Sequence, residues 1–147
     1  MLKKYCALLL LSFTINAVEY QRENNSIFVR LHQGDEIIQS LEQIAATEKI
    51  TTCTVQGIGA ITNVKIGMNK YKLGKYDSII LEGDYELTSL NGDISMHDGI
   101  PVAHLHVTMN NDTYVTFGGH LFNAEVTATA EIILTVFESS VENLYKR

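Results

Sequence analysis

The sequence is poor in the residues that define specialised small scaffolds: it has one proline, two cysteines and no tryptophan. These counts exclude a collagen-like chain, a proline-rich chain and a disulfide-stapled domain. Basic residues are also scarce, because 11 Lys and Arg stand against 17 Asp and Glu and give a net charge of −6. An acidic balance argues against a broad electrostatic footprint on nucleic acid. The 147 residues, 46% of them hydrophobic, are enough for one folded domain with a buried core.

The first 17 residues have the pattern of a secretory signal peptide. Lys3 and Lys4 precede an apolar run from Tyr5 to Leu11, and Ala17 offers a small residue at the cleavage position. This run is shorter than the ~20 apolar residues that span a bilayer. We therefore expect a periplasmic or secreted protein, with an apolar N-terminal strand or helix of the domain as the alternative. Cleavage would change the net charge to −8 and leave a single cysteine.

The rest of the chain predicts an α+β domain over residues 26–140, with a mostly antiparallel sheet and one main helix. The helix is expected to open at Gly34 and Asp35 and to end near Lys49, because its apolar residues follow helical spacing. Residues 124–137 alternate between apolar and polar, which indicates a long strand with one face in the core. Clusters of glycine and polar residues predict turns at 82–84, 91–92 and 110–112, and a break or bend at 57–60.

Three histidines form the main candidate site. His104 and His106 flank Leu105 in an expected strand, so both imidazoles project from one face about 7 Å apart. His120 follows two glycines, and a hairpin between the two segments would bring it beside the first pair. Three neutral imidazoles suit Zn²⁺ and leave one coordination position open for water or substrate. The alternative is a polar strand face with an unrelated surface histidine; His97 and His32 are not expected to be ligands.

Other candidate groups are less specific. Glu86 and Glu131 are candidates for general acid–base groups near the imidazoles or for carboxylates that orient them, and a solvated surface position explains each equally well. Cys53 lies in the apolar stretch ITTCTVQGI and is interpreted as a small buried hydrophobe rather than a nucleophile. Gly57 and Gly59 do not form a dinucleotide fingerprint, because Thr62 replaces its third glycine. The sequence contains no P-loop and no serine-centred nucleophile elbow.

Four segments resemble, in order, the signatures of the plants-and-prokaryotes-conserved (PPC) domain family: QGIGAI (56–61), ELTSLNGDIS (86–95), DGIPVAHLHVTM (98–109) and GGHLFNAEVTATAEIIL (118–134). The resemblance implies an α+β sandwich-like sheet with one helix that assembles as a homotrimer. It also implies a bound metal on His104, His106 and His120. The family carries a DNA-binding label, but its plant members bind DNA chiefly through basic AT-hook segments, which this chain lacks.

The pairing of HLH with GGHL is also distantly similar to acetolactate decarboxylases, in which three histidines hold zinc and the metal polarises a 2-oxo or 2-hydroxy acid. The second spacing is longer here, and Arg30 is the candidate clamp for an acid. Three functions therefore compete: a metal-binding trimer that takes a small ligand or a partner, a zinc enzyme acting on small acids, and a DNA-binding protein. The acidic charge weighs against the third.

Overall fold

The computed structural model describes residues 18–137, so the expected signal peptide at 1–17 lies outside the described residues. These residues form the α+β domain that the sequence predicts, with an antiparallel six-stranded sheet and one helix. In chain order the elements are β1 (Glu19–Glu23), β2 (Ser26–His32), α1 (Ile37–Thr47), β3 (Thr52–Lys70), a 3-10 turn (Tyr71–Leu73), β4 (Lys75–His97), β5 (Ile100–Asn110) and β6 (Thr116–Val136). Within residues 18–137, no helix has the length and apolar character needed to cross a membrane.

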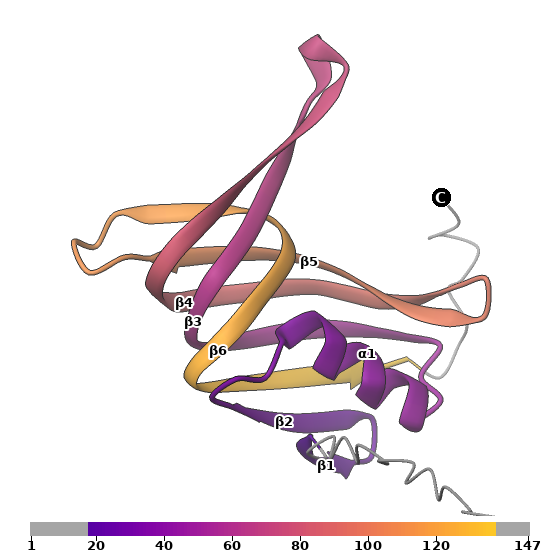
Figure 1. Ribbon diagram of the computed structural model, residues 1–147. Coiled ribbons are helices and arrows are strands. Elements are labelled where there is room, and N and C mark those ends of the chain that lie inside the picture. The colour runs from indigo at the N-terminus through magenta and orange to yellow at the C-terminus, as the bar shows by residue number, and fades with distance from the viewer. Residues whose placement is uncertain (1–17, 138–147) are drawn as a thin grey trace, which may run out of the picture.

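The sheet curls on itself because β6 has two sets of neighbours. The strand order is β1-β2-β6-β3-β4-β5, and β6 also pairs with β5. Strands β3, β4, β5 and β6 therefore form a closed ring of pairings, while β2 and β1 extend the sheet on one side. Helix α1 lies over one face of this sheet (Figure 1). The buried apolar side chains of the sheet and of α1 form one core.

The sheet begins before the expected domain start at residue 26. Strand β1 pairs with β2 in antiparallel register, from Glu19 opposite Arg30 to Glu23 opposite Ser26. The stretch before Ser26 is polar, so its sequence gives no hydrophobic alternation. Its strand conformation comes from backbone hydrogen bonds to the exposed edge of β2.

Helix α1 begins two residues after its expected start. The side chain of Glu36 caps the helix by accepting a hydrogen bond from the Gln39 N–H at 2.6 Å. Asp35 instead accepts from the His32 N–H at 2.8 Å, which stabilises the turn before the helix. The predicted apolar stripe is confirmed, because Ile37, Leu41, Ile44 and Ala45 are buried.

Two predicted turns are wrong. Residues 82–84 and 91–92 both lie inside β4, which runs without interruption from Lys75 to His97. The segment 57–60 is a bend, since β3 continues through it with a register shift between Gly57 and Gly59. These glycines permit close strand contact rather than chain reversal: a Cβ on Gly59 would lie 2.7 Å from Ala130.

The long C-terminal strand is confirmed and extends further than predicted. Strand β6 starts at Thr116, shortly after the predicted turn at 110–112, and includes both glycines that precede His120. Val126, Ala130, Ile132 and Leu134 are buried, as the alternation predicts. Ala128 is exposed instead, because the register between β3 and β6 shifts between Gly59 and Ile61 and breaks the alternation there.

Candidate metal centre

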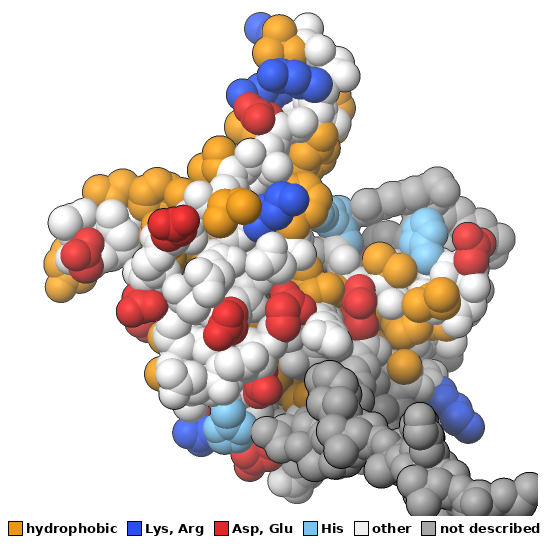
Figure 2. Space-filling view, viewed as in Figure 1, with side chains coloured by type: hydrophobic (Ala, Val, Ile, Leu, Met, Phe, Trp, Pro, Cys, Tyr) orange, Lys and Arg blue, Asp and Glu red, His pale blue; other side chains and the backbone are white. Residues whose placement is uncertain are grey.

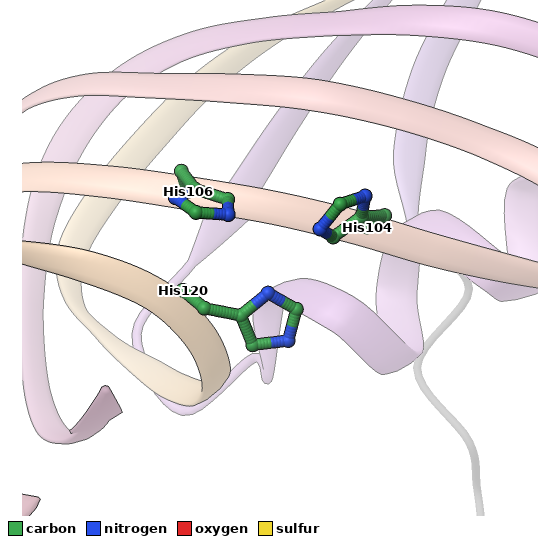
Figure 3. Close-up of side chains that lie close together, drawn as sticks. All are labelled: His104, His106 and His120. Atoms are coloured by element: carbon green, nitrogen blue, oxygen red, sulfur yellow. The ribbon is translucent and has the colours of Figure 1, made fainter. Parts of the chain in front are cut away.

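The three predicted histidines come together on adjacent strands. His104 and His106 lie on β5, and His106 is directly opposite His120 on β6. The intervening Leu105 is fully buried, so both β5 imidazoles project from the face opposite the core. Figure 3 shows the three rings gathered in one cluster.

The geometry of the cluster fits a small transition-metal ion. One ring nitrogen from each histidine lies within 4.8 Å of the others. The ring centroids are 5.1, 5.3 and 5.4 Å apart, close to an equilateral triangle. Tetrahedral zinc with Zn–N distances of ~2.1 Å requires nitrogens roughly 3.4 Å apart. Small rotations of partly exposed side chains reach that spacing, so the three imidazoles fit such an ion.

Other side chains lie beside two of the three imidazoles. The Oδ2 atom of Asp93 lies 4.0 Å from Nδ1 of His104, beyond hydrogen-bond distance. A carboxylate that moved closer and accepted a hydrogen bond from this ring would orient it toward a metal. His120 packs edge-to-face against Phe122 and Tyr76, with ring centroids 4.9 and 6.0 Å away. The sequence does not single out these three residues: Asp93 and Tyr76 reach the cluster from β4 through strand pairing, and Phe122 follows His120 by two residues on β6.

Glycines allow the strands of the site to approach closely. A Cβ on Gly92 would lie 2.0 Å from the carbonyl oxygen of His104, and one on Gly119 would lie 2.8 Å from the carbonyl oxygen of Gly67. Gly119 therefore lets β6 approach β3 closely beside His120. Gly92 has the same function for β4 and β5, although its sequence context predicts a turn.

The two candidate carboxylates lie away from the imidazoles. Glu86 is opposite Asn110, which is four residues beyond His106 and therefore about 13 Å along β5. Glu131 is opposite Ile58, and three strand spacings of ~4.8 Å separate β6 from β5 across this part of the sheet. Arg30, the candidate acid clamp, is 3.9 Å from Glu131 rather than near the histidines. Any acid–base role for either glutamate would need a ligand that spans these distances.

The remaining single-residue interpretations fit the structure. Cys53 is fully buried in the core, and burial raises the pKa of its thiol to about 12, so it stays protonated at neutral pH. His32 lies beside Glu19, with 2.7 Å between Nε2 and Oε2, and does not join the cluster. His97 ends β4 at the turn to β5 and is also outside the cluster.

Comparison with protein families gives one match that covers most of the chain. Residues 18–138 match the model of the Plants and Prokaryotes Conserved domain, abbreviated PCC or PPC. No curated protein sequence matches the chain.

Solved structures with the same fold come from bacteria and archaea. A PPC protein from Pyrococcus horikoshii is 31% identical, with a TM-score of 0.73 and coverage of 85% of each chain. A protein from Bacteroides thetaiotaomicron whose name proposes DNA binding is 25% identical, with a TM-score of 0.80 and coverage of 84% of this chain and 87% of that one. A metal-containing protein from Archaeoglobus fulgidus is 28% identical, with a TM-score of 0.72 and coverage of 84% and 86%.

Proposed function

We propose that this chain, which belongs to the Plants and Prokaryotes Conserved domain family, binds a metal ion. The proposed ligands are His104, His106 and His120. The observation that supports this most directly is the convergence of three imidazole nitrogens within 4.8 Å on two adjacent strands. Zinc is the proposed ion, because it favours imidazole ligands in tetrahedral geometry. The metal-containing relative from Archaeoglobus fulgidus supports the same assignment.

The bound ion would give the protein a binding site for an oxygen-containing ligand. Three protein ligands leave one position of a tetrahedral ion open. In our proposal a small ligand or a partner side chain takes this position, the protein is exported after cleavage near residue 17, and it assembles as a homotrimer. Export is supported by the N-terminal pattern of basic, apolar and small residues, and the trimer by the resemblance to the family.

A zinc enzyme is the second candidate, and the open coordination position favours it. Such an enzyme would polarise a small 2-oxo or 2-hydroxy acid at the ion. The distances of Glu86, Glu131 and Arg30 from the imidazoles favour the binding function, because no candidate acid–base group touches the cluster. Release of CO₂ from acetolactate by the zinc-loaded protein would support the enzymatic function over the binding function.

DNA binding is a weaker proposal for this chain. The name of the relative from Bacteroides thetaiotaomicron supports it, whereas the net charge of −6 opposes it. Association with duplex DNA that weakens steeply with added salt would support DNA binding, because counterions are released from neutralised phosphates.

Metal analysis of purified protein tests the proposed metal centre. Residues 18–147, prepared without a histidine tag, are expected to hold one zinc ion per chain by mass spectrometry. Replacing all three histidines with alanine should remove the ion, because no other group of three potential ligands is present among residues 18–137.

A matched control replaces two histidines outside the cluster. The double variant His32→Ala and His97→Ala should retain a full complement of zinc, since neither residue belongs to the cluster. A wild-type protein that takes up no zinc, or a triple variant that retains it, would contradict the proposed site.

A further inference from the structure

The hairpin of β3 and β4 projects from the body of the molecule at one end (Figure 1). We call this end, residues 65–80, the arm. Strand β3 pairs with β6 only as far as Gly67, and β4 pairs with β5 only from Glu86 onward. Beyond Gly67 the two strands of the arm therefore pair only with each other. A two-stranded ribbon of this kind is marginally stable in water without further contacts.

The arm exposes an unusual number of large apolar side chains. Six of them, each at least 51% exposed, are Met68, Tyr71, Leu73, Tyr76, Ile79 and Ile80. The register of β3 and β4 places Met68 and Ile79 on one face of the ribbon and Tyr76 and Ile80 on the other, so apolar side chains are exposed on both faces of the arm. Large apolar side chains that gather on the surface of a folded protein typically mark an interaction site. The arm is therefore a candidate docking element.

The arm also has the opposite charge to the rest of the protein. It contains four of the seven basic residues in the described chain and one of its fifteen acidic residues, so its formal charge is +3 while the remainder carries −11. Figure 2 shows Lys and Arg gathered on the projecting arm and Asp and Glu spread over the body. Lys70 pairs with Asp77, but no described residue forms an ion pair with Lys72. Such an arm is complementary to an acidic surface.

A groove on the sheet offers an apolar surface with acidic residues beside it. It has a volume of about 770 Å³ and includes Phe28, Ile58 and Ile133, which are 41–56% exposed. In β2, Phe28 alternates with buried residues that face the core, so the groove lies on the face opposite α1. Arg30 lines it together with two acidic residues, Glu19 and Glu131. Their contacts with His32 and Arg30 are solvent-exposed and therefore weak, so an incoming cation can replace them.

The arm cannot reach the groove of its own chain. The part of β3 between Ile58 and the tip of the arm covers roughly 40 Å of extended chain and leads away from the groove. We infer that the arm of one copy inserts into the groove of a second copy. Tyr71 and Leu73 then cover the apolar floor of the groove, and Lys72 faces its glutamates.

This contact rests on the proposed homotrimer and specifies how its subunits join. The arm and the groove are different surfaces, so the interface is head-to-tail and each copy uses both surfaces once. A head-to-tail interface closes into a ring when its rotation allows, and a ring of three satisfies every arm and every groove. Asn91 lines the groove and lies directly opposite His106, so the docked arm borders the metal centre of its neighbour.

Single substitutions on either surface test the contact by light scattering after size exclusion. Leu73→Asp places a charge at the tip of the arm, and Ile58→Asp places one in the groove. Each substitution is expected to weaken association roughly 30-fold or more, because it removes an apolar contact at the centre of the interface. Both variants should therefore be monomers at micromolar concentration. Ile100→Asp is the matched control, because Ile100 is 64% exposed on β5 and belongs to neither surface. It should remain trimeric.

Mixing the two defective variants distinguishes this contact from any symmetric one. The Ile58→Asp copy retains an intact arm and the Leu73→Asp copy retains an intact groove, so a one-to-one mixture should form a heterodimer with one contact. Circular dichroism must show native folding of each variant for the comparison to hold.

Each of the following outcomes would overturn the inference. If the wild type and both variants are trimeric, or if the mixture contains only monomers, the arm does not dock in the groove while the proposed trimer stands. If the wild type is a monomer at all concentrations, both the trimer and the contact fail. If that monomer binds phosphatidylglycerol vesicles and Leu73→Asp abolishes this binding, the arm is a membrane-binding element instead.

Discussion

Single residues in this protein have functions that only their neighbours across the sheet reveal. Gly92 follows an asparagine, and this pair favours a hairpin turn in many sequences. Here it lies within β4, where its missing side chain lets the backbone of β5 approach at His104. The glycine therefore contributes to the spacing of the strand that presents two of the three candidate metal ligands.

Replacing Gly92 with alanine should destabilise the protein by about 3 kcal/mol, since the added Cβ would lie 2.0 Å from a backbone oxygen and the strands must separate. We also expect lower zinc occupancy, because His104 moves with its strand. Urea unfolding and metal analysis of the same preparations measure both effects.

Gly99→Ala is the matched control for this substitution. Gly99 lies in the turn between β4 and β5 with φ +81° and open space around it. Alanine there should lower stability by about 1–2 kcal/mol, which is the backbone strain of a positive φ. Equal stability losses in the two variants would show that close packing at Gly92 is not the cause.

At the scale of elements, the carboxylate of Glu48 links β1 to the C-terminal end of α1. Glu48 accepts hydrogen bonds from the hydroxyl of Tyr20 and from Nη1 of Arg22, both at 2.9 Å. The hydrogen bond from Arg22, followed by that from Tyr20, lowers the pKa of Glu48 below its usual value of 4.5. The same contact with Glu48 raises the pKa of Tyr20.

A carboxyl group with a lowered pKa stabilises the folded protein in its charged form. Its contribution is complete above pH 4.5 and is lost as the pH falls through the lowered pKa of the folded state. Glu48→Gln should therefore reduce the free energy of unfolding at pH 7 by less than about 1 kcal/mol, because the group is partly solvated.

Urea unfolding at pH 7 and at pH 3 measures this effect. The difference between wild type and Glu48→Gln should shrink toward the lower pH. Glu23→Gln, which removes a charge from the end of the same strand β1, should alter stability little at either pH. A Glu48→Gln effect that grows on acidification would refute the assigned ion pair.

At the scale of the whole molecule, the candidate metal centre lies where the sheet closes on itself. His106 and His120 occupy β5 and β6, whose pairing completes the ring of four strands. An ion bound by both strands would favour the closed sheet over the unfolded chain, because the unfolded chain does not hold the three imidazoles together.

Zinc at a concentration 100 times its dissociation constant should stabilise the protein by about 2.7 kcal/mol. For a domain of this size, the melting temperature should rise by roughly 10 °C. Thermal unfolding with and without zinc measures the shift. The triple alanine variant at positions 104, 106 and 120 should show none, and an equal shift in that variant would locate the ion elsewhere.

Sequence patterns predicted the parts of this structure that depend on local periodicity. Alternation along a strand places His104 and His106 on one face, and helical spacing identifies the buried side of α1. The apolar surroundings of Cys53 likewise predict its burial. Each of these conclusions needs only the geometry of one element and the preference of apolar side chains for the core.

The tertiary structure decided whatever depends on contacts between distant segments. The sequence alone does not distinguish a glycine that turns the chain from one that admits a neighbouring strand, so the turns expected at 82–84 and 91–92 lie inside β4. The polar strand β1, the position of Asp93 beside His104 and the closure of β6 against β5 also arise from pairing across the sheet. Local periodicity in the sequence determined the buried side of α1 and most of the core positions of β6, with Ala128 as an exception. Long-range strand pairing decided that His104, His106 and His120 meet.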